Sequence, residues 1–87
     1  MTFLYILRCC DDALYVGTTD DLTARLERHN RGAGCAFTAR RTPVTLEHSE
    51  EFATRAEAIT RERQVKGWTR AKKEALIAGN MDLLRRL

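Results

Sequence analysis

The chain has 87 residues, of which 44% are hydrophobic and 31% are charged. This composition excludes a disordered chain and allows one small hydrophobic core, so we expect a single domain over residues 1–87. The three cysteines lack the spacing of a disulfide framework or of a zinc site. No apolar run approaches the roughly 18 residues of a membrane span, and no secretory signal precedes Phe3, so we expect a cytoplasmic protein without membrane contact.

Two short apolar segments rich in β-forming residues begin the chain. Phe3–Leu7 and Ala13–Gly17 have the length and composition of strands, and Asp11-Asp12 between them is a turn signal. We therefore expect an antiparallel hairpin. The apolar character of both faces of Phe3–Leu7 predicts a central strand that is covered on two sides.

A first helix and a loop follow the hairpin. Residues 18–21 offer N-cap side chains, and Leu22 and Leu26 then recur at helical spacing. The glycine-rich, arginine-flanked segment 30–41 has the composition of a loop. Pro43 precedes a third predicted strand, Val44–Ser49.

The last third of the chain is predicted to be helical. Thr54 and Glu57 form a capping box that begins a helix ending near Lys66, with Gly67 as its stop. Thr69 caps a further helix that ends at Gly79, and residues 82–87 add a final turn or two. The order β-β-α-β-α-α predicts an α+β fold, a three-stranded antiparallel sheet flanked by helices.

The net charge is +3, and the basic residues are concentrated in two segments. Five arginines and one acid lie between Thr23 and Arg41, and seven basic residues and two acids lie between Arg55 and Lys73. This distribution fits contact with a phosphate backbone, and it equally fits solvated helix surfaces. The candidate nucleic-acid contacts in these segments are Arg28, Arg31, Arg40, Arg41, Arg61, Arg63 and Lys66.

The two predicted strands carry paired motifs, Phe3-Leu4-Tyr5 and Tyr15-Val16-Gly17. They stand where the GIY-YIG family has Gly-Ile-Tyr and, about ten residues later, Tyr-Ile-Gly. The chain resembles this family over residues 3–78, and it is most similar to the small stand-alone bacterial branch (UPF0213-like). Phe3 replaces the first glycine, a departure that the small branch shares.

Three further residues match the family pattern. Arg25 follows the second tyrosine by ten residues, and His29 matches a histidine that many members carry. Glu62 lies in the segment Glu57–Lys66, which resembles the segment that carries the metal-binding glutamate. The resemblance therefore implies catalytic roles for Tyr5, Tyr15, Arg25, His29 and Glu62.

The implied activity is that of a metal-dependent nuclease that hydrolyses phosphodiester bonds, with DNA favoured and a place in repair or recombination. Glu62 would hold one Mg²⁺ or Mn²⁺ ion, and Arg25 would neutralise charge on the phosphate. Tyr5 or Tyr15 would orient or deprotonate the water, and a base role requires a tyrosine pKa lowered by Arg25 and the metal. His29 would share the base role or donate to the phosphate.

The turn of the hairpin decides whether the two tyrosines can act together. Side chains alternate between faces, so Tyr5 and Tyr15 share a face only if the loop has an odd length or contains a bulge. A three-residue loop at Cys10–Asp12, with Asp12 in the left-handed region, satisfies this condition. We predict this loop.

Alternatives remain open at this stage. The chain could be a nucleic-acid-binding module with little or no cutting activity, or, on weaker grounds, a protein-interaction domain. His29 could be a helix cap and Lys66 a packing residue, while we expect His48 to be structural and Trp68 to anchor the core. The sequence leaves the choice between DNA and RNA, and the oligomeric state, undecided.

Overall fold

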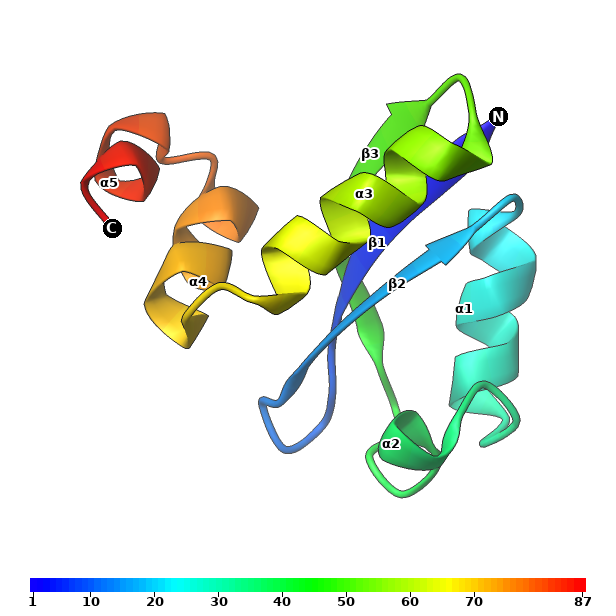
Figure 1. Cartoon of the computed structure of the whole chain (residues 1–87). Helices are drawn as coiled ribbons and strands as arrows, with labels where there is room; N and C mark the ends of the chain where they lie inside the picture. Colours follow the sequence, from blue (N-terminus) through cyan, green and yellow to red (C-terminus); the bar gives the residue numbers. More distant parts are fainter.

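The computed structural model describes residues 1–87 as a three-stranded antiparallel sheet with helices on both faces (Figure 1). This is the predicted α+β class. In chain order the elements are β1 (Thr2–Arg8), β2 (Leu14–Thr19), α1 (Leu22–Asn30), α2 (Ala36–Ala39), β3 (Thr45–Phe52), α3 (Arg55–Lys66), α4 (Arg70–Ala78) and α5 (Met81–Arg86).

The sheet has the strand order β2-β1-β3, so the first strand of the chain lies in the centre. Both pairings are antiparallel, and the β1–β2 register places Tyr5 opposite Gly17 and Leu7 opposite Tyr15. Residues that lie opposite each other, or two apart along a strand, share a face. Tyr5 and Tyr15 therefore lie on the same face of the sheet.

A three-residue turn sets this register. The backbone N–H of Cys9 donates to the carbonyl of Ala13 at 2.8 Å, and the N–H of Asp12 donates to the carbonyl of Cys9 at 2.9 Å. Asp12 has a φ of 72°, in the left-handed region. The predicted loop at Cys10–Asp12, including the conformation of Asp12, is confirmed.

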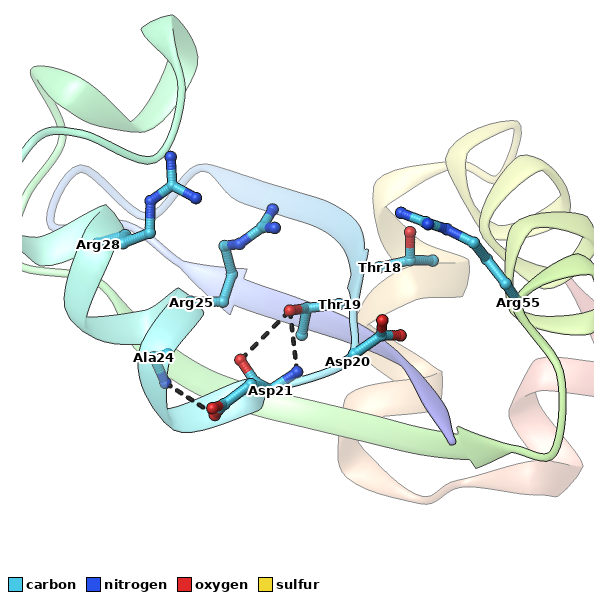
Figure 2. A pocket seen from close by; sticks show the side chains of 8 residues that line it. All are labelled: Thr18, Thr19, Asp20, Asp21, Ala24, Arg25, Arg28 and Arg55. Carbon is cyan, nitrogen blue, oxygen red and sulfur yellow. Dashed lines mark hydrogen bonds between the residues drawn. The ribbon is translucent and has the colours of Figure 1, made fainter.

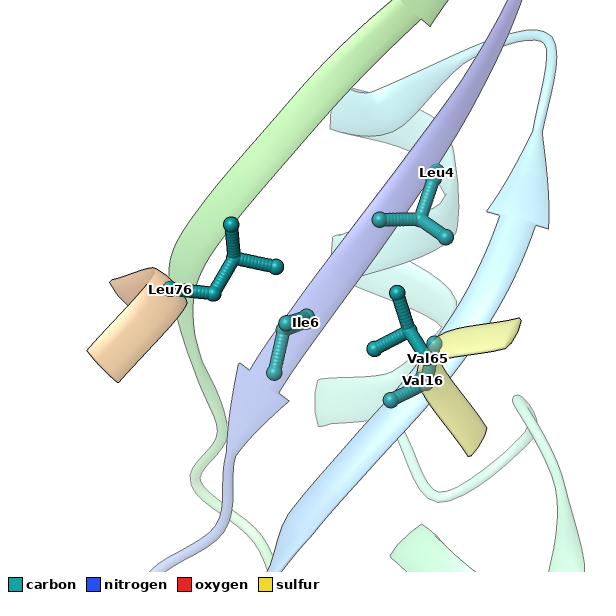
Figure 3. Close-up of a cluster of buried hydrophobic side chains, with 5 residues drawn as sticks. All are labelled: Leu4, Ile6, Val16, Val65 and Leu76. Carbon is teal, nitrogen blue, oxygen red and sulfur yellow. The ribbon is translucent and has the colours of Figure 1, made fainter. Parts of the chain in front are cut away.

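The α3 face of the sheet holds one of two hydrophobic clusters. Leu4 and Ile6 of β1 and Val16 of β2 pack against Val65 of α3 and Leu76 of α4 (Figure 3). Leu4, Ile6 and Val65 are completely buried. This packing fixes the orientation of α3 over the sheet, and so decides which of its side chains reach the β2 edge.

The opposite face of the sheet holds the second cluster. Its buried members are Tyr5, Leu7, Cys9 and Val44, and partly buried side chains that include Tyr15, Leu22 and Leu26 pack against them. The apolar side chains of α1 thus cover this face. Strand β1 is buried on both sides, as its composition predicted.

The predicted capping residues lie at the ends of α3 and α4, but of the two glycines that end these helices only Gly79 has a left-handed conformation. The Thr54 hydroxyl accepts from the Glu57 N–H at 3.3 Å, and the Thr69 hydroxyl accepts from the N–H of Lys72. Gly79 ends α4 with a φ of 70°, whereas Gly67 after α3 has a φ of −79° and requires no glycine-specific conformation.

Three boundaries differ from the prediction. Strand β2 continues through Thr18 and Thr19, which leaves Asp21 to cap α1 through the Ala24 N–H. Strand β3 ends at Phe52 rather than at residue 49. The predicted loop 30–41 contains α2, whose four residues are too few to show a helical period in the sequence.

Arg8 connects the end of the hairpin to the rest of the fold. Its guanidinium donates to Glu47 at 2.7 Å, to Asp12 at 2.8 Å and to Glu74 at 2.5 Å. These hydrogen bonds lower the pKa of the Glu74 carboxyl below its ordinary range. Asp12 and Glu47, which lie outside the basic segments of the sequence, thus bind Arg8 and stabilise the fold.

Candidate active site

Tyr5 and Tyr15 lie side by side beneath α1, with ring centroids 6.3 Å apart. Tyr5 is 1% exposed, whereas Tyr15 is half-buried. The Tyr15 ring also lies 5.3 Å from the ring of His29 and 5.8 Å from that of Phe37. The two tyrosines therefore have different environments, and Tyr5 is the enclosed one.

Gly17 makes room for the Tyr5 phenol. A Cβ atom at position 17 would lie 2.6 Å from the Tyr5 hydroxyl oxygen and 2.7 Å from Cζ, closer than packed atoms approach. The phenol thus lies over the Cα atom of the residue opposite it in the sheet. The glycine of Tyr15-Val16-Gly17 is required by this contact.

His29 joins Tyr5 to the loop before β3. In the last turn of α1 it is 1% exposed, and its Nε2 lies 3.0 Å from the Tyr5 hydroxyl. Its Nδ1 lies 2.7 Å from the Thr38 hydroxyl. Both ring nitrogens have hydrogen-bond partners inside the protein, so His29 is not a solvent-facing helix cap.

The loop after α1 closes over the same histidine. A Cβ atom at Gly34 would lie 2.2 Å from Nδ1 of His29, so only glycine permits this path of the backbone. Thr38 in α2 then presents its hydroxyl to the ring. Thr38 was absent from the residues that the sequence singled out, because nothing in its local pattern marks it.

Burial controls the protonation of this cluster. It raises the pKa values of Tyr5 and Tyr15 above 10, and the positive charge of Arg25, which acts in the opposite direction on Tyr5, does not compensate. Arg25 alone therefore does not give a tyrosine the lowered pKa that a base role requires. Burial and the charges of Arg25 and Arg28 lower the pKa of His29 below 6.5, so His29 is neutral at pH 7.

Arg25 and Glu62 reach the tyrosines from opposite faces of the sheet. Arg25 on α1 is partly exposed and has no ion-pair partner, and its charge favours the ionised form of Tyr5. Glu62 on α3 raises the pKa of both tyrosines through its negative charge. Its side chain is 19% exposed and lies 3.3 Å from Nζ of Lys66. The structure thus brings both predicted charges near the phenols.

The sequence model of the GIY-YIG catalytic domain matches residues 1–75. The chain belongs to the GIY-YIG family. The paired GIY-YIG motifs lie in β1 and β2, which place Tyr5 and Tyr15 on one face of the sheet. In the pairing of these strands, Tyr5 lies opposite Gly17 and Tyr15 lies opposite Leu7.

Relatives and a solved structure within the GIY-YIG family support this assignment. The chain is 43% identical to a UPF0213 protein of Haloquadratum walsbyi over 81 residues, which cover 93% of this chain and 91% of the relative. It is 47% identical to a UPF0213 protein of Staphylococcus aureus over 75 residues, 86% of this chain and 92% of the relative. The solution NMR structure of a UPF0213 protein from Bacillus halodurans, 37% identical, superposes with a TM-score of 0.58 over 90% of this chain and 84% of that one.

The GIY-YIG site has one carboxylate near the tyrosines. No group of three or more histidine, cysteine, aspartate or glutamate side chains is arranged to hold a metal ion. A divalent ion that keeps most of its water needs only one or two carboxylates, and Mg²⁺ commonly binds in this way. The single carboxylate of Glu62 fits such an ion.

Two of the predicted nucleic-acid contacts have partners within the protein. Arg61 donates to Glu50 at 2.9 Å and lies over the ring of Trp68, and Arg41 donates to Asp11 at 3.0 Å and lies over the ring of Phe37. These ion pairs would have to be exchanged before either arginine contacts a phosphate. The distant acids that pair with them could not be recognised from local sequence.

The other predicted contacts remain accessible. Lys66 is half-exposed and pairs with Glu62, while four arginines make no ion pair: Arg28, Arg31, Arg40 and Arg63. Trp68 packs against the hydrophobic core, as expected, and His48 contacts Glu50 at 2.8 Å, in keeping with a structural role.

A small pocket lies beside the tyrosine cluster, at the end of β2. It has a volume of about 240 Å³, and it is lined by Arg25 and Arg28 from α1 and by Arg55 from α3 (Figure 2). Thr18, Thr19, Asp20, Asp21 and Ala24 complete its lining. Arg55 was not among the residues selected from the sequence.

No helix in the fold combines the length and the apolar character needed to cross a membrane.

Proposed function

We propose that the chain is a nuclease that hydrolyses phosphodiester bonds, with DNA as its substrate. The observation that carries this proposal is the hydrogen bond between Tyr5 and His29 in a cluster that also receives Arg25 and Glu62. These residues come from β1, α1 and α3, and they supply a proton acceptor, a cation and a carboxylate. Those are the groups that in-line hydrolysis of a phosphodiester requires.

His29 is the group that accepts a proton at neutral pH. The Thr38 hydroxyl donates to the carbonyl of Cys35 at 3.4 Å, so it is free to accept from Nδ1–H of His29. Nε2 then carries a lone pair and accepts from the Tyr5 hydroxyl. A water that gives its proton to Tyr5, while Tyr5 gives its own to His29, becomes hydroxide for attack on phosphorus.

Arg25 stabilises the charge that develops on the phosphoryl oxygens. Its guanidinium has no internal ion pair, so no carboxylate competes with the substrate for it. The planar fork can contact two oxygens at once, and the low exposure of the adjacent tyrosines limits screening by water. This arrangement favours the transition state over the ground state.

Glu62 would hold the divalent ion, Mg²⁺ or Mn²⁺. When bound, such an ion acts as a Lewis acid and stabilises the departing 3′-oxygen. The Glu62 carboxylate lies 3.3 Å from Nζ of Lys66, so an ion bound by Glu62 would compete with this contact. Removal of this carboxylate is therefore the most direct test of the proposed chemistry.

A binding module without cutting activity is the second candidate. The near-complete burial of Tyr5 and the single carboxylate of the site favour it. Binding requires only the accessible arginines around α1 and α3, whose charges are not balanced within the protein.

Nicking of supercoiled plasmid in the presence of Mg²⁺ or Mn²⁺ separates the two candidates. We expect cutting by the unmodified protein and none by Glu62→Gln. Glu51→Gln is the matched control, because Glu51 is an exposed carboxylate on β3 without a hydrogen-bond partner. If the unmodified protein leaves supercoiled, branched and single-stranded DNA uncut, the binding module is the correct function. Equal cutting by Glu62→Gln would refute the assigned role of Glu62.

A further inference from the structure

The pocket at the end of β2 has the features of an anion site. Arg25 and Arg28 enter it from the helix on one face of the sheet, and Arg55 enters it from the helix on the other face (Figure 2). Three arginines from segments that are far apart in sequence thus line one pocket at the edge strand. The fold, and not local composition, brings them to this pocket.

None of the three arginines forms a salt bridge inside the protein, whereas Arg8, Arg41, Arg61, Arg70 and Arg85 all do. Arg25 acts on Tyr5 through its charge and a side-chain hydrogen bond. The five N–H donors on each guanidinium of Arg28 and Arg55 remain available to a ligand.

The two aspartates of the pocket form no salt bridge with its arginines. The Asp21 side chain accepts from the Ala24 N–H at 3.0 Å and so caps α1, and Asp20 accepts from the Thr2 hydroxyl at 2.9 Å. Both acids hold the backbone around the pocket in place. The positive charge of the pocket exceeds its negative charge by one.

The position of Arg55 is unfavourable for the protein alone. Arg55 is the first residue of α3, where the helix dipole favours acidic side chains, and it faces the like charges of Arg25 and Arg28. A bound anion would relieve both effects. A stability cost that a ligand removes is typical of a binding site.

We propose that this pocket binds a second phosphate of the nucleic-acid strand, next to the phosphate that is cut. Arg28 and Arg55 are its ligands, and the Thr18 hydroxyl adds a donor. Arg25 lies between the pocket and the tyrosines, so one strand can pass from the reacting centre over the edge of β2. Arginine forks suit phosphate better than they suit a single carboxylate oxygen. This proposal rests on the proposed nuclease function and adds to it that the substrate must carry a flanking phosphate.

Inorganic phosphate tests the pocket without any cutting. In NMR titrations we expect it to shift the arginine Nε–H signals of Arg25, Arg28 and Arg55 and to raise the melting temperature. Arg55→Gln should weaken this binding about tenfold or more, the equivalent of one lost charged hydrogen bond. Arg86→Gln is the control, because Arg86 is an exposed arginine on α5 without a partner. Equal effects of the two variants would overturn the proposal.

Cutting supplies the second test. Arg55→Gln should lower kcat/KM on an oligonucleotide about tenfold or more, mainly through KM, and should affect hydrolysis of bis(4-nitrophenyl) phosphate much less, because that diester has no flanking phosphate. Arg55→Lys should recover part of the loss. If the protein binds phosphate in the pocket and cuts nothing, the nuclease proposal fails and the pocket is a nucleic-acid phosphate site without a neighbouring cut. If it cuts and Arg55→Gln behaves like Arg86→Gln in both tests, the pocket proposal fails alone.

Discussion

The Tyr5 hydroxyl lies 3.0 Å from Nε2 of a histidine that is almost completely buried, His29. Burial keeps the phenol protonated and the imidazole neutral, so the two groups form a donor and an acceptor at pH 7. In the proposed mechanism, proton transfer in this pair runs from the tyrosine to the histidine.

The cutting rate should therefore depend on the protonation of His29. The pKa of His29 is lowered from 6.5, so the rate should be constant near pH 7 and fall at a pH below 6.5, where protonated His29 cannot accept. Because the tyrosine pKa values are raised above 10, no loss from the phenols is expected up to pH 9. Rates measured from pH 5 to 9 check this expectation. An acid limb that persists unchanged in folded His29→Gln would contradict it.

Thr38 should stabilise the protein through His29. In Thr38→Val the ring Nδ1 is buried without a partner, which costs about 1–3 kcal/mol of unfolding free energy. Thr38→Ser keeps the hydroxyl and should lose less than about 1 kcal/mol. Urea unfolding of the three proteins checks this difference. If Val and Ser cost the same, the hydrogen bond contributes nothing measurable.

Gly17→Ala should disturb the site more than the fold. The added Cβ would meet the Tyr5 hydroxyl at 2.6 Å and displace the phenol from His29, with a cost of about 1–3 kcal/mol. Gly67→Ala is the matched control: its Cβ would lie 3.5 Å from its nearest contact, and its backbone φ of −79° suits alanine. We expect Gly67→Ala to be neutral or to stabilise the protein by about 0.4–1 kcal/mol. Thermal unfolding and the His29 ¹⁵N shifts provide the readouts.

Replacement of Arg25 should affect the chemical step. Arg25→Ala should lower kcat about 10²-fold or more, the scale of one preorganised donor in an active site. Arg25→Lys should restore little, because a single ammonium cannot reproduce two-point contact with phosphate. Single-turnover cutting rates check this, with Arg86→Ala as the control. Full activity in Arg25→Lys would show that only charge matters at this position.

The salt dependence of DNA binding should distinguish free arginines from paired ones. Arg28→Gln should reduce the slope of log affinity against log salt by about 0.9, the value for one phosphate contact on duplex DNA. Arg61→Gln should leave the slope unchanged, because Glu50 already balances Arg61. Binding curves between about 50 and 200 mM salt measure both slopes. A lower slope for Arg61→Gln would mean that DNA displaces Glu50.

The sequence was sufficient wherever a local rule decides the geometry. The alternation of side chains in a strand required an odd turn between Tyr5 and Tyr15, and the structure has the three-residue turn. Helical spacing put His29 one turn after Arg25 on α1. Contacts between distant segments were not accessible in this way. The Thr38–His29 hydrogen bond, the Glu50–Arg61 ion pair and the approach of Arg55 to Arg25 all depend on packing across the sheet.

The same limit explains the protonation states. A base role requires a tyrosine pKa lowered by Arg25 together with a metal ion, and the charge of Arg25 does act in that direction on Tyr5. The larger effect is burial beneath α1 and beside Gly17, and burial is a property of the assembled fold. The local sequence identified Arg25 as a charged neighbour, but it could not show that burial changes the tyrosine pKa more than this charge does.

Gly17 lies in an edge strand and should make β2 less rigid than the central strand β1. It adds no side chain to the packing of β2 and leaves the backbone more conformational freedom, and β2 has a neighbouring strand on one side only. Its amide hydrogens should therefore exchange with solvent before those of the central strand β1. Each local opening moves Gly17 away from the phenol that it covers. The strand that shields Tyr5 from water is thus also the one whose fluctuations admit water to it.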